Sequence, residues 1–524
     1  MSSIYSYLPL YASWENTSEP APIELCSDLG AVFLGGDGMN RNLEENLSYL
    51  KEKLGYGITF DFIIRKLKVA HKQGALVFFD GFIDGDSTVH IMRDLQAVPQ
   101  ISTTQGALEQ LLQKHVPFFE ISIADSLDAA IDELLSGTML LLIDGIKEIA
   151  VLDVRQYVTR GSEEPTLEKV TRGSRDGFVE TALFNVNLIR RRIKDPNLRF
   201  EALKVGRRSQ TDVLIGYIRD IADPSLVEEI KSRIEAIDRD AIPMGGKNLE
   251  EYILGTVFNP IPVTRYTERP DVAAAHLLEG HITIIVDTTP FVLLVPVTVW
   301  HFTQHAEEYF QNPPVGTYLR WVRTLGIFGS LILLPLWYQL ALSPNLPEWI
   351  AFVGPKEPGR LALWLQLLLL ELGLDLIRMA LIHTPDSLAT SLGLVGAIIL
   401  GDLAVSVGLF TGEAILYVAI VAICSFATPS IEFGNAIRLF RYLLFFGAVL
   451  AGWWGLGAAL IVVMLVFGLT KSFGIPYLWP LVPFDGPAFL RVIFRFPIPQ
   501  VAVRPRLTRP QDQRAQKKRN RGGR

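Results

Sequence analysis

Three charged side chains lie in an otherwise apolar stretch of this sequence. Glu371, Asp375 and Arg378 are separated by four and three residues, a spacing that places all three on one face of a helix. A charge at membrane depth costs roughly 2.5–3.5 kcal/mol on insertion scales, so such groups normally face a protein interior or a water-filled path. Carboxylates along a water-filled path favour cations. The pattern indicates a pore, and an interfacial helix with solvated charges explains it equally well.

Two further observations belong to the pore interpretation. Arg378 follows Asp375 by three residues and is expected to pair with it, which would leave Glu371 as the freer carboxylate. Asp402 interrupts the next apolar stretch. The candidates for a pore lining are therefore Glu371, Asp375, Arg378 and Asp402.

A second group of residues has the chemistry of a metal site. His301 and His305 are four residues apart and would share one face of a helix, as zinc ligands do. His276 and His281 precede them in the sequence. A polar helix beside a membrane, with His301 and His305 exposed to headgroups or to a neighbouring subunit, explains the same pattern. We predict this second arrangement, with no metal and no cofactor.

Catalytic motifs are absent from the sequence. It contains no GxxxxGK[ST], no strand-linked GxGxxG, no GxSxG and no CxxC pair. The dipeptides Asp80-Gly81, Asp84-Gly85 and Asp144-Gly145 each follow an apolar run and are typical of turns. We therefore expect a protein that is not an enzyme.

The region around the charged helix is apolar enough to lie in a membrane. Residues 379–437 are 59 positions without Lys or Arg, and a helix needs about 20 apolar residues to cross a bilayer. Ile437–Leu469 is too long for one crossing, and Gly452-Trp453-Trp454-Gly455 at its centre predicts a tight helical hairpin. The sequence thus predicts about six helical segments, the first four at 325–342, 361–383, 392–409 and 415–427.

The first half of the chain is polar and mixed in charge. Asn42–Leu54 has the pattern of a helix, Ala75–Phe82 that of a buried strand, and Thr138–Asp144 with Glu148–Val154 that of a hairpin. We expect an α+β cytosolic region of two small subdomains, followed by an all-α polytopic membrane domain. The predicted divisions are a flexible segment 1–40, subdomains 41–118 and 119–270, a juxtamembrane region 271–322, a membrane domain 323–472, an interfacial segment 473–503 and a basic tail 504–524.

Charge and cysteine content bear on location. The formal net charge is -6, and the tail from Arg504 contributes nine basic residues and one acidic residue. We expect this tail to be solvated near anionic lipid headgroups, and without aromatic residues it has no surface for reading nucleic acid. The N-terminal sequence lacks the positive and apolar regions of a signal peptide, so the soluble half is expected in the cytoplasm. The placement of Lys and Arg, with an even number of crossings, puts the basic tail on the same side. Cys26 and Cys424 lie in opposite halves, which suits a reduced compartment.

Several long strings resemble the A subunits of the GerA-type spore germination receptors. They are VEEIKSRIEAIDRDAI, RGSRDGFVETALFNVNLIRRRIKDPNLRFEALKVGRRSQTDVLIGYI, TERPDVAAAHLLEGHITIIVDTTPFVLLVP, SLGLVGAIILGDLAVSVGLFTG and SFGIPYLWP. The resemblance covers about residues 45–495. The string HFTQHAEEYFQNP is most like the stage V sporulation protein AF branch of this family.

The resemblance implies a multi-pass protein of the spore inner membrane that acts in germination, when cations leave the dormant core. It implies a homo-oligomer, a pentamer, around an ion-conducting pore, with a small membrane partner subunit and the germination receptors as partners. This branch is expected to amplify ion release. Where the family often reads Glu-Ala-Gly before Arg-Leu-Pro, this chain has IRMALIHTP at 377–385, so the chemistry of the pore does not transfer directly.

Two other functions remain open from the sequence. A secondary transporter of a small acid or amino acid is disfavoured, because the membrane region shows no internal repeat of the kind that transporters carry. The second alternative is a non-conducting scaffold whose soluble region assembles a germination complex.

Overall fold

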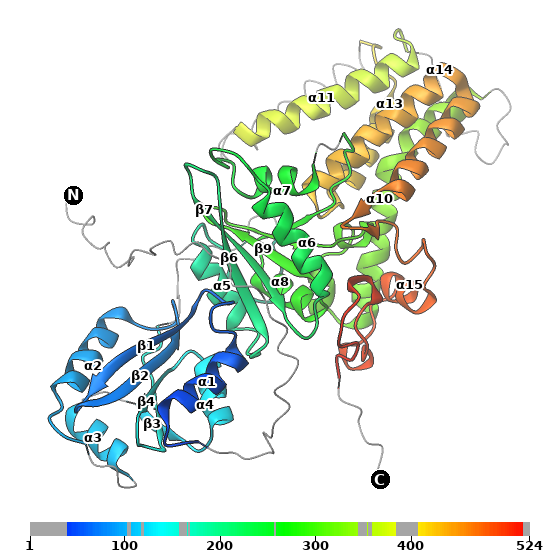
Figure 1. Cartoon of the computed structure of the whole chain (residues 1–524). Helices are drawn as coiled ribbons and strands as arrows, with labels where there is room; N and C mark the ends of the chain where they lie inside the picture. Colours follow the sequence, from blue (N-terminus) through cyan, green and yellow to red (C-terminus); the bar gives the residue numbers. More distant parts are fainter. Residues whose placement is uncertain are drawn as a thin grey trace, which may run out of the picture. The chain divides into compact units, whose positions relative to one another are not determined.

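The computed structural model describes residues 39–101, 106–116, 120–156, 165, 168–255, 258–343, 354, 359–383 and 407–516. Within these ranges an α+β region, made of two halves, precedes a helical region (Figure 1). The predicted order, an α+β region and then a helical region, agrees with this arrangement.

The first half is a five-stranded antiparallel sheet with helices on both faces. Its strand order is β1-β2-β4-β5-β3. Helices α1 and α4 pack on one face, and α2 and α3 on the other. The elements are α1 (Leu43–Leu54), β1 (Phe62–Val69), β2 (Lys72–Phe79), α2 (Gly85–Ala97), α3 (Ala107–His115), β3 (Ile121–Ala124), α4 (Leu127–Leu135), β4 (Met139–Ile143) and β5 (Ile149–Leu152).

The local sequence explains the limits of α1. The Asn42 side chain accepts the N–H of Glu44 at 3.0 Å and so caps the first turn. Lys51 and Lys53 lie in the last turn, where cations are favoured. Gly55 then ends the helix in the left-handed region at φ 70°. The predicted helix is confirmed, as is the predicted hairpin, because β4 pairs with β5.

The second half is also a five-stranded antiparallel sheet between two layers of helices. Its strand order is β6-β7-β9-β10-β8. Helices α5 and α8 cover one face, and α6 and α7 the other. The elements are α5 (Ala182–Arg190), β6 (Leu198–Val205), β7 (Thr211–Ile218), α6 (Pro224–Glu235), α7 (Gly246–Leu254), β8 (Arg265–Thr267), α8 (Pro270–Leu278), β9 (Ile282–Val286) and β10 (Val292–Val295).

The two halves therefore repeat one order of helices and strands. The repeat extends to single contacts: Asp144, after β4, accepts the N–H of Leu43 at 3.2 Å, and Asp287, after β9, accepts that of Ala182 at 3.1 Å. Leu43 and Ala182 are the first residues of α1 and α5. Each carboxylate thus fixes the first helix of its half to the end of the same strand, a similarity that the sequence did not reveal.

The repeat corrects one predicted boundary. The division expected between residues 118 and 119 falls inside the first sheet, because β4 pairs with β2, with Val77 opposite Leu140. The halves divide after β5 and before α5 instead. Pairing between strands so far apart in the chain leaves no mark in a local hydrophobic pattern.

A buried ion pair joins the halves. Asp61, just before β1, accepts from Arg190 Nε at 2.5 Å and from Arg190 Nη2 at 2.8 Å, and both side chains are fully buried. The guanidinium also lies over the ring of Phe79, 4.3 Å from its centroid, and near Phe200. The pair connects the last residue of α5 with the start of the first sheet.

The helical region begins after β10. Its elements are η1 (Val299–Phe302), α9 (Glu307–Phe310), α10 (Pro313–Leu342), α11 (Leu363–His383), α13 (Gly412–Phe426), α14 (Ile431–Leu469), β11 (Lys471–Ser472), β12 (Ile475–Pro476), α15 (Gly486–Ile493), η3 (Ile498–Gln500) and η4 (Arg506–Thr508). Helix α10 packs against both α13 and α14, and α11 against α13 (Figure 1).

Two of the described helices, α10 and α14, are long and apolar enough to cross a membrane, and α13 is a shorter apolar helix. Helix α14 is broken at Ala451 and Gly452, where φ is -134° and 60°. A Cβ on Gly447 would lie 2.7 Å from the carbonyl oxygen of Gly455, so the two arms lie against one another. This is the helical hairpin expected over residues 437–469. Most of the predicted segment 392–409 lies outside the described residues.

The described part of the basic tail packs onto the second half. Arg504 donates to the carbonyl of Leu278 at 2.7 Å and pairs with Asp512 at 2.7 Å. Gln511 donates to the carbonyls of Arg219 and Ala222. Residues 504–511 are thus held by protein contacts, whereas the sequence predicted a solvated tail near anionic lipid headgroups.

Candidate functional site: a charged cluster between the apolar helices

Glu371 of α11 lies at the centre of a charged cluster. Its side chain is buried, and its Oε2 accepts from Arg441 Nη2 of α14 at 2.6 Å. Arg441 Nη1 also donates to the carbonyl oxygen of Ser330 in α10 at 2.8 Å. One guanidinium therefore joins three helices.

The other two charges of α11 bind different partners. Asp375 pairs with Arg438 of α14 at 3.0 Å and accepts from the Tyr442 hydroxyl at 2.9 Å. Arg378 donates to Ser425 Oγ of α13 at 2.5 Å. The expected pairing of Arg378 with Asp375 is therefore not formed, because Arg378 bonds to α13 and Asp375 bonds to α14.

The orientation of α11 follows from these contacts. Its charged face meets α13 and α14, while Leu372, Leu376 and Met379 are 47%, 68% and 62% exposed. An apolar outer face suits lipid or a neighbouring subunit. Glu371 is thus not the freer carboxylate, since Asp375, at 26% side-chain exposure, is more open to solvent.

The cluster has more positive than negative charge. Glu371 and Asp375 contribute -2, and Arg378, Arg438 and Arg441 contribute +3, so the sum is +1. Sequence reasoning missed Arg438 and Arg441 as members, although their spacing of three residues places them on one face of a helix. Asp402, the fourth predicted pore residue, lies outside the described residues.

A second buried charge group lies where α10 begins. Glu308 is fully buried and pairs with Arg320 Nε at 2.7 Å and with Arg323. Arg320 Nη1 also donates to the carbonyl oxygens of Arg491 and Val492 at 2.8 Å each. These bonds fix the start of α10 to α9 and to α15.

Three histidines form a cluster between α8, β9 and η1. The ring centroids of His276, His281 and His301 are 5.0–5.5 Å apart. The Nδ1 atoms of His276 and His281 bond backbone carbonyls at 2.8 and 3.2 Å, so each carries a proton there. Nδ1 of His301 accepts the N–H of Thr298 at 3.0 Å. Every Nδ1 is thus occupied by the backbone.

The histidines do not have the predicted arrangement. His301 lies in the short helix η1 and His305 after it, so they share no helix face. Burial lowers the pKa of His281 to about 4 and holds the pKa values of His276 and His301 well below their usual value, with neighbouring imidazoles adding to the effect for the latter two. Within the described residues no group of histidine, cysteine or carboxylate side chains is placed to hold a metal ion.

Two sheet-containing halves joined to apolar helices, with buried ion pairs between those helices, define a membrane-associated α+β protein. The family model described as Bacillus/Clostridium GerA spore germination protein matches residues 48–507. The chain belongs to this GerA family, as its sequence indicated.

Individual relatives extend this result. Stage V sporulation protein AF of Bacillus subtilis (strain 168) is 42% identical over 473 residues, which cover 90% of this chain and 96% of that protein. Spore germination protein KA of the same organism is 32% identical over 464 residues, 87% of this chain and 85% of that protein. The crystal structure of the N-terminal domain of the A subunit of the Bacillus megaterium spore germinant receptor GerK3 aligns with 49% of this chain and 96% of that chain, at 32% identity and a TM-score of 0.38.

Proposed function

We propose that this protein is a membrane subunit of a spore germination complex, and that copies of it assemble around an ion-conducting path. Membership of the GerA family and the 42% identity to stage V sporulation protein AF support the germination role. In this proposal the protein is a multi-pass protein of the spore inner membrane with both termini in the core. Its partners are further copies of the chain, a small membrane subunit and the germination receptors, with anionic lipid at the basic tail.

The observation that carries the ion-path proposal is the charged cluster of α10, α11, α13 and α14. Five charged side chains at the depth of apolar helices are costly unless they serve a polar path or hold a structure together. We infer two states of this cluster, of which the structure has the first. With the pairs Glu371–Arg441 and Asp375–Arg438 formed, the polar groups neutralise one another, whereas separation of α11 from α14 would expose them to water.

The proposed path is lined by Glu371, Asp375, Arg378 and the α14 arginines, with Asp402 as a further candidate. A net charge of +1 in the cluster gives no preference for cations by itself. A cation preference of the path would need further carboxylates, and Asp402 would supply one per subunit. Removal of a carboxylate from the path should therefore favour anions, and removal of a guanidinium should favour cations.

Single-channel recording of the purified full chain in a planar bilayer tests the proposal. In a salt gradient, Asp375→Asn should shift the reversal potential towards the equilibrium potential of the anion, and Arg378→Gln should shift it towards that of the cation. The two variants serve as controls for each other, because both remove one charge from the same helix face. A wild-type chain without conductance, alone and with its small membrane partner, would favour a non-conducting scaffold. Shifts of the same sign in both variants would place the cluster outside the path.

A further inference from the structure

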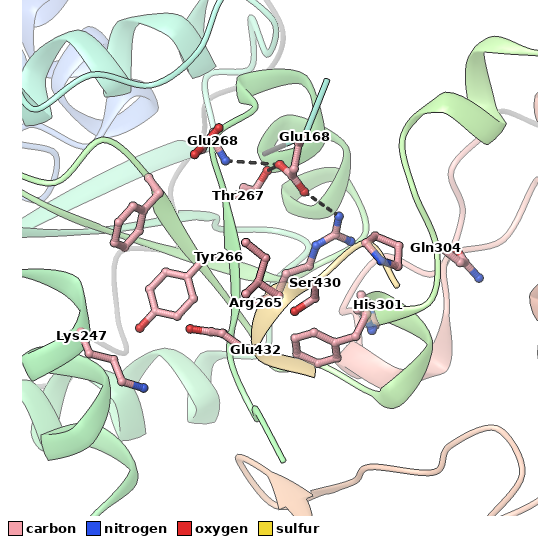
Figure 2. A pocket seen from close by; sticks show the side chains of 14 residues that line it. Glu168, Lys247, Arg265, Tyr266, Thr267, Glu268, His301, Gln304, Ser430 and Glu432 are labelled. Carbon is pink, nitrogen blue, oxygen red and sulfur yellow. Dashed lines mark hydrogen bonds and ion pairs between the residues drawn. The ribbon is translucent and has the colours of Figure 1, made fainter. Parts of the chain in front are cut away.

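A cavity lies where the second half meets the start of α14. Its volume is about 320 Å³, within the range of small-molecule sites. Its walls come from segments far apart in the chain, as Figure 2 shows. They are Glu168, α7 (Lys247), β8 and the residue after it (Arg265, Tyr266, Thr267, Glu268), Phe291, η1 and its neighbour (His301, Phe302, Gln304), and the entry to α14 (Pro429, Ser430, Ile431, Glu432).

The two cations of the wall already have carboxylate partners. Arg265 Nη2 donates to Glu168 Oε1 at 3.1 Å, and Lys247 donates to Glu250 Oε2 at 2.6 Å. Glu250 also accepts from the Tyr266 hydroxyl at 2.6 Å. An anionic ligand would therefore have to displace a carboxylate from Arg265 or from Lys247.

Glu432 differs from these groups. Its carboxylate forms no hydrogen bond or ion pair with any residue that the structure describes, although Lys247 and Glu250 are close enough to act on its charge. Burial and, after it, the charge of Glu250 raise the pKa of Glu432 to about 7, and Lys247, which is bonded to Glu250, lowers it only in part. A positively charged group beside Glu432 would favour the ionised carboxylate and would be attracted to it.

The rest of the wall suits an organic cation better than a hydrated inorganic ion. Tyr266 and Phe291 pack edge to face with ring centroids 4.8 Å apart, and Phe302 provides a third ring in the wall. Aromatic faces attract ammonium groups, and rings pack against apolar bodies. We propose that this cavity binds a small organic molecule with a protonated primary amine, whose ammonium group contacts Glu432 and whose apolar body lies among Tyr266, Phe291 and Phe302.

Such a ligand would connect two parts of the molecule. Glu432 lies in the first turn of α14, the helix that also carries Arg438 and Arg441, while Tyr266 and Phe291 belong to the second half. Occupancy would therefore add a contact between the α+β region and the helix that holds the charged cluster. The inference goes beyond ion conduction and does not depend on it, because binding can be measured on a protein that conducts nothing.

Isothermal titration calorimetry on the purified full chain, with 2-phenylethylammonium chloride as the probe, tests the proposal. We expect saturable binding of this amine. 2-Phenylethanol and 3-phenylpropionate, which keep the ring without the positive charge, should bind at least tenfold more weakly. Glu432→Gln should lower the affinity for the amine at least tenfold, and Phe291→Leu, which keeps an apolar side chain but removes the ring, several-fold. Glu235→Gln, on the exposed face of α6, is the matched control and should bind as the wild type does.

Each other result would overturn the proposal. Equal binding of the alcohol would show an apolar cavity without cation recognition. Equal heats with ammonium or potassium chloride would show an inorganic ion site. Unchanged affinity in Glu432→Gln would show that the amine does not bind at Glu432. Glu432→Gln keeps the size of the side chain and removes its repulsion from Glu250, so it should fold, and Phe291→Leu provides a second variant for the same conclusion.

Discussion

The first and second α+β halves use one framework at matching positions but differ in the side chains that it carries. Met139 and Ile282 begin β4 and β9, and Ile149 and Val292 begin β5 and β10, and both pairs are 143 positions apart. At the same offset, Ser126 caps α4 through the N–H of Ala129, whereas Arg269 precedes α8 and reaches Asp271 and the carbonyls of Glu168 and Ser174. The position that caps a helix in the first half thus holds a network of hydrogen bonds in the second.

The same contrast recurs along this side of the second sheet. Ile121 and Ile123 of β3 contribute to an apolar core, while Arg265 and Tyr266 of the equivalent edge strand β8 line the cavity. Thr138 precedes β4, whereas His281 precedes β9 and packs against His301 of η1. The differences gather where the second half contacts the helical region. Apolar runs thus maintain the framework in both halves, and residues at element ends adapt the second half for contact with the helical region.

The largest expected effect on folding free energy comes from the Asp61–Arg190 ion pair between the halves. Asp61→Asn removes one partner of the buried Asp61–Arg190 pair and leaves the guanidinium uncompensated, which should cost about 3–5 kcal/mol of folding free energy. Because the pair lies between two distinct hydrophobic cores, unfolding by urea should change from one transition to two. Circular dichroism of the full chain in detergent measures both effects.

The exposed pair Arg207–Asp240, at 3.1 Å and with more than half of each side chain exposed, supplies the control. Asp240→Asn should cost less than about 1 kcal/mol, since surface ion pairs contribute little. An equal cost for both substitutions would mean that the buried pair does not hold the halves together.

Local patterns were sufficient for parts of this architecture and insufficient for the rest. The helix 43–54, the β4–β5 hairpin and the break in α14 follow from caps, apolar runs and length, which are properties of neighbouring residues. The first sheet pairs β2 with β4 across α2, α3, β3 and α4, and the repeat is hidden because different apolar side chains fill equivalent strands. The partners of Glu371 and Asp375 lie on another helix, and spacing within α11 reports only contacts inside that helix. The cavity likewise joins segments from Glu168 to Glu432.

An effect of intermediate size concerns the pH dependence of stability, to which His281 of the second half should contribute and Thr138, its counterpart in the first half, should not. Unfolded histidine binds a proton below about pH 6.5, whereas the folded His281, whose burial lowers its pKa to about 4, does not. The unfolded chain therefore binds more protons between these values, and stability should fall as the pH decreases through this window. His281 alone should account for about 2 kcal/mol between pH 7.5 and pH 5.

His281→Thr tests this point by placing in the second half the residue that the first half has at the matching position. The variant should lose some stability at pH 7.5 but should show a shallower decline towards pH 5 in denaturant titrations at each pH. An unchanged slope would exclude His281 as the source of the pH dependence, whatever the loss of stability at neutral pH.

The smallest expected effect tests the framework itself. Asp144→Ala and Asp287→Ala each remove the carboxylate that accepts the first N–H of α1 or α5, and loss of such a cap costs roughly 0.5–2 kcal/mol. If the halves are equivalent here, the two costs should agree within about 0.5 kcal/mol, and each should appear as faster amide exchange in the first turn of its own helix. Hydrogen exchange with mass spectrometry on peptides from 43–50 and 182–188 resolves the two helices in one experiment. Faster exchange in α1 alone would mean that Asp287 no longer acts as a cap, so that α5 depends on the Asp61–Arg190 pair at its other end. Because α5 ends in a buried ion pair, whereas the last turn of α1 is held by the hydrogen bond from Arg199 to the carbonyl oxygen of Lys53, such a result would locate the divergence of the two halves in this helix as well.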